Sequence, residues 1–281
     1  MVSMYSTKEV IDSYKTFLEV KYPGHFQSFS HRVKDQKESA KAEAITFSFL
    51  RSNFEDVQVA EDISTGGADF LCKSNGSEFI VEVTCLEAES VATQSEWKNE
   101  IPENVSAGSF GMITHMLRTK VSGKTMQLSG YSGPRILVIT CEHIAADVLL
   151  GTHGAELLLT SDTKIEVPIG KPIDTIDIVT DLKDSVFFRH KNGALESCRR
   201  SISAILLFSV FANKTLVVGL LHPDPEYIFP ISLLPSIPFM RMKEWPPVKN
   251  RIEIEWVIDK PKEAEFYHRK VELTDKELKS R

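Results

Sequence analysis

The sequence predicts an α/β domain in which helices flank a mixed β-sheet. Two strand-forming runs flank Asn75-Gly76 and predict a β-hairpin, with helix-like segments before and after it. The run PRILVIT (134–140) is short, apolar and unbroken, which is typical of a strand buried on both faces of a sheet. The resulting order, a helix, three strands, a helix and a strand, indicates a sheet covered by helices.

The composition excludes several classes of protein. With 42% hydrophobic and 26% charged residues among 281, the chain has a globular composition. Its first residues lack the apolar core of a signal peptide, and no run approaches the ~18 apolar residues of a membrane span, so we expect a cytoplasmic protein without a membrane partner. The four widely spaced cysteines include no CxxC pair and predict free thiols. A net charge of −6 argues against coating nucleic acid by bulk charge, so any nucleic-acid site must be local.

The first third of the chain predicts two helices and a strand. A helix is expected over 6–22, where Pro23-Gly24 should stop it and a polar loop should follow. A second helix, 35–54, carries an apolar stripe with Glu43 beside it. The run VQVAEDIS (57–64) then predicts a strand that leads into the hairpin.

The remaining elements surround this core. Residues 87–108 are polar and predict an irregular loop, and 110–127 predict a helix. The elements predicted beyond PRILVIT are a helix at 142–150, a strand within 195–211, its hairpin partner at 214–222, a proline-rich surface segment at 223–247, an edge strand at 251–259 and a short helix at 274–281. The whole chain, 1–281, is therefore predicted to be one domain, with a core at 36–141, a helical extension at 1–35 and a C-terminal elaboration at 142–281.

A two-residue turn at Asn75-Gly76 fixes the register of the hairpin. Ser74 then faces Ser77, and the same pairing places Asp69 opposite Glu82. Two carboxylates whose Cβ atoms lie roughly 5 Å apart repel each other, so this pair needs a cause. A shared cation supplies one, because Mg²⁺ takes oxygen ligands and usually binds through one or two carboxylates. The alternative is a strand end at which both carboxylates are solvated.

The order of the acidic residues resembles the PD-(D/E)xK nucleases, the restriction-endonuclease-like superfamily. Glu43 lies on a predicted helix, Asp69 begins the hairpin, and Glu82-Val83-Thr84 lies on its second strand. The resemblance covers roughly residues 38–141 and implies a restriction-endonuclease-like mixed sheet. It also implies that Asp69 and Glu82, with the Val83 carbonyl, ligate Mg²⁺, with Mn²⁺ as the alternative, and that Glu43 completes the metal site.

The lysine of this motif is displaced. Thr84 stands at its position, whereas Lys120, Lys124 and Gln127 fall at i, i+4 and i+7 on one face of the next predicted helix. The family is known to move its lysine to a neighbouring element, so Lys124 or Lys120 is expected to orient the attacking water. Lys124 is favoured because it lies closer to Gln127, which should support the site. Gln127 and Tyr131 also have the spacing of the QxxxY element of RecB-like nucleases.

The function expected from this resemblance is metal-dependent hydrolysis of nucleic acid, DNA in preference to RNA. Whether the chain acts as a monomer or as a homodimer is left open. Thr84 leaves a second interpretation, a catalytically inactive nuclease-fold protein that binds nucleic acid or another protein. A third is an unrelated α/β binding protein, for which Glu43, Asp69 and Glu82 would share no pocket. The sequence has no HExxH, phosphate-loop or nucleophile-elbow pattern. A basic cluster is interpreted as a charged loop and consists of Arg189, His190, Lys191, Arg199 and Arg200.

Overall fold

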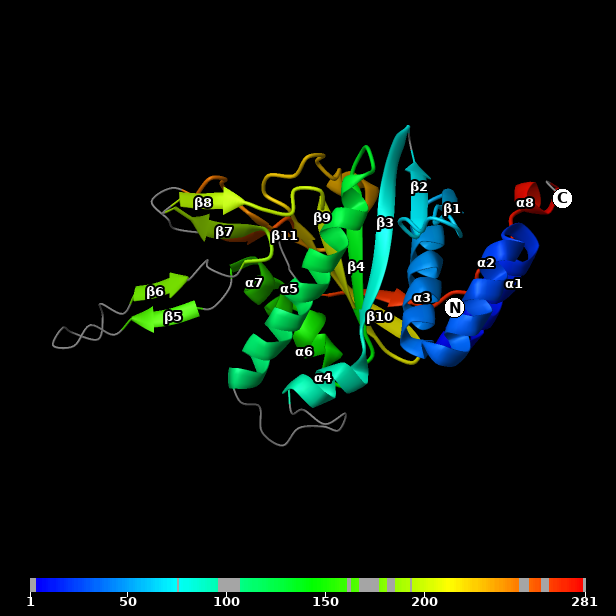
Figure 1. Cartoon of the computed structure of the whole chain (residues 1–281), viewed down its shortest axis with the longest axis horizontal. Helices are drawn as coiled ribbons and strands as arrows, with labels where there is room; N and C mark the ends of the chain where they lie inside the picture. Colours follow the sequence, from blue (N-terminus) through cyan, green and yellow to red (C-terminus); the bar gives the residue numbers. More distant parts are fainter. Residues whose placement is uncertain are drawn as a thin grey trace.

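A mixed β-sheet with helices on both faces forms the centre of the structure, a computed structural model (Figure 1). The structure describes residues 4–74, 76–95, 107–160, 163–166, 177–180, 185–192, 194–247, 253–258 and 263–279. The helices are α1 (Thr7–Lys21), α2 (Pro23–Asp35), α3 (Lys37–Asn53), α4 (Ala88–Ser95), α5 (Ala107–Ser129), α6 (Ala146–Leu150), α7 (Thr152–Thr160), the 3₁₀ helix η2 (Ile231–Leu233) and α8 (Asp275–Lys279). The strands are β1 (Asp56–Val59), β2 (Phe70–Ser74), β3 (Ser77–Leu86), β4 (Arg135–Cys141), β5 (Thr163–Glu166), β6 (Asp177–Thr180), β7 (Phe188–Lys191), β8 (Ala194–Ser197), β9 (Ala204–Val210), β10 (Lys214–Leu221), β11 (Phe239–Met242), β12 (Ile254–Trp256) and β13 (Ala264–Tyr267).

Within the described ranges, nine strands belong to one sheet. Their order is β1-β2-β3-β4-β9-β10-β11-β12, and β13 pairs with β10 beside this path. Strands β1, β2 and β3 are antiparallel neighbours, whereas β3, β4 and β9 run parallel. Both strand pairs outside the sheet, β5-β6 and β7-β8, are antiparallel hairpins. The predicted mixed sheet flanked by helices is therefore confirmed.

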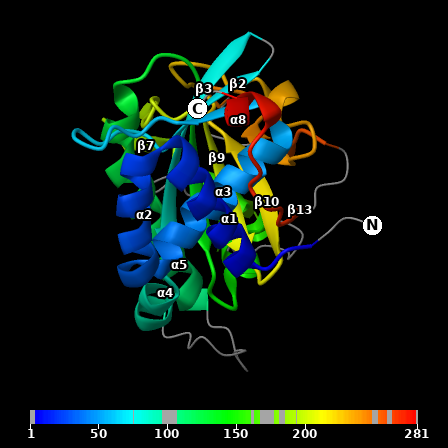
Figure 2. The same cartoon turned by 90° about the vertical axis from the view of Figure 1, so that its right-hand side faces the viewer.

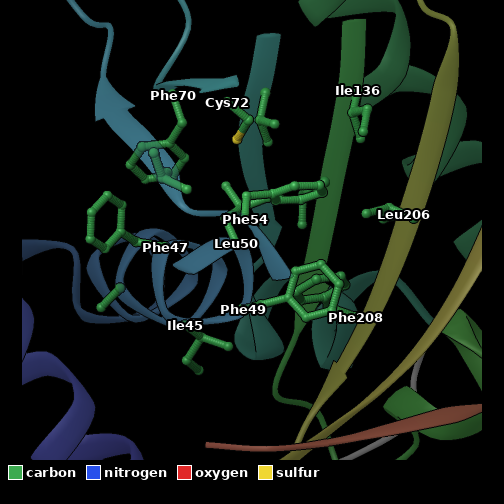
Figure 3. Close-up of a cluster of buried hydrophobic side chains, with 14 of the residues drawn as sticks. Ile45, Phe47, Phe49, Leu50, Phe54, Phe70, Cys72, Ile136, Leu206 and Phe208 are labelled. Atoms are coloured by element: carbon green, nitrogen blue, oxygen red, sulfur yellow. The ribbon is translucent and has the colours of Figure 1, made fainter. Parts of the chain in front are cut away.

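Helices α1 to α3 cover one face of the sheet and α4 to α7 cover the other (Figures 1 and 2). On the first face, Phe47 and Phe49 of α3 contact Phe70 and Phe208, with ring centroids 5.3 and 5.1 Å apart (Figure 3). Burying one such side chain contributes about 1.5–3 kcal/mol. All seven residues of β4 are buried, and its side chains alternate between the two cores, as predicted for a central strand.

The β2-β3 hairpin has the predicted register. Ser74 pairs with Ser77, and Phe70 pairs with Val81. Gly76 has a φ of 76°, the positive value that a tight hairpin turn requires, and Asn75 lies outside the described residues. Continuation of the register by one residue past β2 places Asp69 opposite Glu82, at the end of the ladder.

Three predictions in the first half need correction. Pro23 does not stop the helical region but is the first residue of α2, because the missing N–H of proline is not needed at that position. Residues 87–108 include a helix, α4, whose first backbone N–H, that of Ala88, donates to the carboxylate of Glu38 at 2.9 Å. A partner 50 residues away leaves no local signal in the sequence. The strand predicted over 57–64 ends at Val59, because a turn begins soon after it.

The second half adds strands to the same sheet. Strands β9 and β10 form the predicted antiparallel hairpin, β12 is the predicted edge strand, and α8 is the predicted tail helix. The helix expected over 142–150 begins only at Ala146. The proline-rich segment is more than a surface wrap, because its β11 pairs with β10 in parallel. The loop predicted for the basic cluster is wrong for Arg189 and Lys191, which lie on β7 and pair with β8, whereas Arg199 and Arg200 lie in the connection between β8 and β9.

Arg135 attaches the end of α5 to the sheet. It is the first residue of β4, and its side chain is only 1% exposed. Its Nη1 donates to the backbone carbonyls of Leu128 at 3.1 Å and Tyr131 at 2.9 Å, and its Nη2 pairs with Glu226. A buried charge is costly unless it is hydrogen-bonded, so these contacts fix the C-terminal end of α5 against β4.

All four cysteines are free thiols, as predicted. Burial raises the pKa of the Cys85 thiol to about 11, so this group is protonated at neutral pH. Among the described residues, no helix combines the length and the apolar character needed to cross a membrane.

Candidate functional site

A small polar pocket opens where the chain enters β2. Its volume is about 140 Å³. The lining residues are Arg32, Ser39, Ala42, Glu43, Glu61, Gly67, Asp69, Glu82, Val83, Thr84, Lys124 and Gln127. The structure thus brings together every proposed site residue except Lys120, which is exposed on α5 and does not line the pocket. Glu43, Asp69 and Glu82 thus share one pocket, so the observation that would have established an unrelated α/β binding protein is not met.

Glu82 is held by two side chains of α5. It lies on β3 and is 2% exposed. Lys124 Nζ lies 2.5 Å from its Oε1, and Gln127 Nε2 donates to its Oε2 at 3.0 Å. Lys124 Nζ also donates to Gln127 Oε1 at 3.1 Å, a contact that the i, i+3 spacing on a helix allows. The cationic partner of the acidic pair is thus Lys124, and Thr84 only lines the pocket.

Asp69 is fixed by the backbone of the opposite strand. Its Oδ2 accepts a hydrogen bond from Val83 N at 2.7 Å. Burial is the main cause that raises the pKa of the Asp69 carboxyl, the Val83 N–H opposes it, and the negative charge of Glu61 adds to it. The alternative considered from the sequence, a strand end at which both carboxylates are solvated, is therefore wrong.

Glu43 enters the pocket from α3 and is 6% exposed. Its Oε1 accepts a hydrogen bond from the Tyr14 hydroxyl at 3.0 Å, and Arg32 Nη2 lies 2.6 Å from its Oε2. The Oε2 atom has no partner with hydrogen-bond geometry in the part of the chain that the structure describes. Burial raises the pKa of the Glu43 carboxyl above its ordinary value against the opposing charge of Arg32, and Asp69 raises it further.

Burial and mutual repulsion also act on Glu82. Burial is again the main cause that raises its pKa, followed by the charge of Asp69, while Lys124 opposes both. Three carboxyls with raised pKa values in one pocket mark a place where the fold concentrates negative charge at a cost in stability. Such groups cluster at functional sites more often than elsewhere.

The loop before β2 positions Asp69 in the pocket. Asp62 Oδ1 accepts from the backbone N–H groups of Ser64 and Thr65 and so forms a tight turn. Gly67 has a φ of 139°, and a Cβ at this position would lie 2.5 Å from the Tyr131 hydroxyl oxygen. The Tyr131 hydroxyl accepts from Ala68 N at 2.7 Å, and the Gln127 amide donates to the Gly67 carbonyl. Gln127 and Tyr131 therefore act together, as their spacing suggested, by holding this loop.

Sequence reasoning missed Tyr14, Arg32 and Glu61. Tyr14 and Arg32 contact Glu43 from two other helices, and one of these, α2, was predicted as a loop. Glu61 lies in a segment that was predicted as strand, where its position relative to Asp69 could not be inferred. A prediction of α2 from Pro23 would have placed a basic side chain on a helix next to Glu43.

The oxygen atoms of this pocket suit a hard divalent ion. Among the described residues, no group of three or more His, Cys, Asp or Glu side chains is arranged to hold a metal ion as the side chains stand. Lys124 occupies one oxygen of Glu82, and Arg32 occupies one oxygen of Glu43. The donor set nevertheless fits Mg²⁺ in its chemistry, because it consists of carboxylate oxygens, and an ion would replace the Arg32 and Lys124 contacts to Glu43 and Glu82.

Comparisons with protein-family models, with curated proteins and with solved structures found no match to this chain. The chemistry of the pocket therefore has to be inferred from its own residues. Two buried carboxyls, the half-buried carboxyl of Asp69, an ammonium and an amide can bind a divalent cation, orient a water molecule and place a positive charge beside an anion.

Proposed function

We propose that this chain is a metal-dependent nuclease that hydrolyses phosphodiester bonds of nucleic acid, DNA in preference to RNA. The observation that supports this best is the convergence of Glu43, Asp69, Glu82, Lys124 and Gln127 in one pocket from α3, the start of β2, β3 and α5. Acidic residues alone would suit many cation sites. The lysine contact to Glu82 favours a catalytic site over a site that only binds a cation, because it places an ammonium beside the acidic pair.

The arrangement of elements supports a restriction-endonuclease-like fold. Helix α3 precedes an antiparallel β1-β2-β3 meander, and α5 leads into β4, which pairs with β3 in parallel. The acidic residues lie on β3 and at the start of β2, and the helices on the two faces of the sheet supply Glu43 and Lys124. Fold does not establish function, so the proposal depends on the side chains of the pocket.

Asp69 and Glu82, with the Val83 carbonyl, would hold Mg²⁺ or Mn²⁺, and Glu43 would hold a second ion or its water. The bound ion would polarise water and stabilise the developing charge of the phosphate. Lys124 presents N–H donors beside Glu82 and can orient the attacking water. Gln127 fixes both Glu82 and Lys124 through its amide. Arg32 places a guanidinium in the same pocket, where it can bind a phosphate oxygen.

Thr84 favours a second candidate, a nuclease-fold protein that binds nucleic acid without cleaving it. The two candidates differ in one measurement. Purified protein is incubated with linear, circular and branched DNA and with RNA, each in Mg²⁺, in Mn²⁺ and in chelator. We expect cleavage that requires the metal and is lost in Asp69→Ala and in Glu82→Ala. Binding without cleavage under all of these conditions would favour the second candidate.

The matched control is Glu78→Ala, because Glu78 is an acidic residue of the same β2-β3 hairpin that pairs with Lys73 at 2.7 Å and does not line the pocket. This variant should retain cleavage. Cleavage that survives in Asp69→Ala would come from another site or a contaminant, and the nuclease proposal would be wrong.

A further inference from the structure

A second hollow lies on the other flank of α5. It is a cleft of about 700 Å³ between α5 and the β7-β8 hairpin. Four basic residues line it, His115 and Arg118 from α5, Arg189 from β7 and Arg199 before β9, and its described lining includes no Asp or Glu. In a chain of net charge −6, this concentration of positive charge is local. Such a cleft suits a polyanion.

Helical geometry places the cleft and the site on opposite flanks of α5. At about 100° per residue, Ser122 and Arg118 face away from Lys124 and Gln127. Ser122 and Arg118 line the cleft, whereas Lys124 and Gln127 line the site. Helix α5 is therefore a ridge with the acidic pocket on one side and the basic cleft on the other.

The outward side of α5, between the pocket and the cleft, is exposed. Thr119, Gly123 and Met126, at i, i+4 and i+7, are all exposed, and Met126 is 81% exposed. A Cβ built on Gly123 meets nothing within 4 Å, so packing within the protein does not require a glycine there. Glycine is disfavoured inside a helix, and a reason for it here is the close approach of another molecule.

The basic flank is rigidly built. Arg199 has a φ of 59°, an uncommon conformation for a residue other than glycine. Its Nη1 donates to the Val186 carbonyl at 2.7 Å, and its Nη2 donates to Ser122 Oγ of α5 at 2.6 Å. These bonds hold the hairpin region at a fixed separation from α5. Arg189 is exposed, and the residue facing it on β8, Glu196, pairs with Lys191 instead, at 3.5 Å.

We propose that α5 lies along the major groove of double-stranded DNA, with one sugar–phosphate backbone at the acidic pocket and the other in the basic cleft. The major groove of B-form DNA is about 12 Å wide and accepts one α-helix, so the two backbones would flank α5 as the pocket and the cleft do. The major groove of A-form RNA is too deep and narrow for this. The inference rests on the proposed function and specifies its substrate as duplex DNA.

Binding in chelator tests this without any cleavage. The anisotropy of a fluorescent duplex and of its isolated strand is measured across a salt series. Arg189→Glu should weaken duplex binding about 10-fold at 0.1 M salt and reduce the slope of log K against log salt by about 1. The matched control is Arg269→Glu, the same charge change at an exposed arginine of the C-terminal segment that packs beside α3. It should leave both the affinity and the slope unchanged.

A second variant adds a bulky side chain to the exposed side of α5 and changes no charge. Gly123→Leu points into open space and improves helix propensity, so the fold should be kept. Duplex binding should fall by about 10-fold or more, while binding of the isolated strand changes less.

Unchanged duplex affinity in Gly123→Leu, an equal loss for the single strand in Arg189→Glu, or no duplex binding by the unmodified protein would each overturn the proposal. Duplex binding that depends on Arg189 and Gly123, without cleavage in Mg²⁺, would instead refute the nuclease function and leave the docking mode intact.

Discussion

Replacing Asp69 with asparagine should make the metal-free protein more stable above neutral pH. Asp69 faces Glu82 at the end of the hairpin, and burial together with neighbouring negative charge raises the pKa of both carboxyls. Asparagine removes one charge, and its side-chain oxygen can still accept the hydrogen bond from Val83 N. The substitution therefore removes repulsion and retains the contact that positions the side chain.

The size of the effect follows from Coulomb's law. Two unit charges about 5 Å apart, in an effective dielectric constant of about 20, repel by about 3 kcal/mol. Asp69 is only half-buried, and Lys124 partly neutralises Glu82, so we expect a gain of about 1–2 kcal/mol in the free energy of unfolding. In a chain of this length that corresponds to a rise in Tm of roughly 2–6 °C.

The raised pKa values of these carboxyls determine how the free energy of unfolding changes with pH. A carboxyl with a raised pKa keeps its proton in the folded chain at pH values where the unfolded chain has already lost it. The free energy of unfolding therefore falls as pH rises from about 4, the ordinary carboxyl value, towards the raised pKa values. The gain from Asp69→Asn should be largest at pH 8 and should shrink towards pH 5.

Thermal unfolding followed by circular dichroism in chelator, at pH 5 and pH 8, measures this gain. The control is Asp62→Asn in the same loop, where hydrogen bonds from Ser64 and Thr65 lower the pKa of Asp62 to about 2, so this variant should lower the Tm. Addition of Mg²⁺ should raise the Tm of the unmodified protein and leave that of Asp69→Asn unchanged. A loss of stability in Asp69→Asn at pH 8 would refute the account of the pocket as a site of unbalanced negative charge.

Three further predictions concern the same pocket. Lys124→Met should reduce cleavage by at least 100-fold in a steady-state assay and Lys120→Met by less than 3-fold, because only Lys124 contacts Glu82; equal losses would contradict the assigned role. Arg32→Ala should increase the Mg²⁺ affinity measured by calorimetry, because the guanidinium no longer competes for Glu43. In the unmodified protein and in this variant, the affinity should rise from pH 6 to pH 8 as the carboxyls lose protons. A pH-independent affinity would exclude these carboxyls as ligands. Gly67→Ala should lower the free energy of unfolding, measured in urea, by about 1–3 kcal/mol, because residue 67 has a positive φ. The control Gly123→Ala should raise the free energy of unfolding by about 0.4–1 kcal/mol. A stabilising Gly67→Ala would show that the loop does not need this conformation.

The parts of the fold that could be predicted depend on short-range patterns. The dipeptide Asn75-Gly76 determines the hairpin register through local backbone geometry, and that register places Asp69 opposite Glu82. The i, i+3 spacing of Lys124 and Gln127 gives them a common helix face, and the structure points both at Glu82. An alternation of period two or a helical spacing carries this information without any knowledge of the tertiary structure.

The parts that could not be predicted depend on partners distant in the sequence. The first N–H of α4 is satisfied by Glu38 of α3, and Glu43 is contacted by Tyr14 and Arg32 from two other helices. Pro23 is compatible with either a helix stop or a helix start, and the choice depends on packing against α1 and α3. Such contacts become visible only when the elements are placed in space.

The buried guanidinium of Arg135 has an electrostatic consequence for α5. Aligned peptide dipoles leave a helix with about half a negative charge at its C-terminal end, and this is the end that carries Lys124 and Gln127. Uncompensated, it would repel an approaching phosphate. Arg135 donates to the last carbonyls of α5, those of Leu128 and Ser129, and so satisfies backbone oxygens that carry the negative end of the helix dipole.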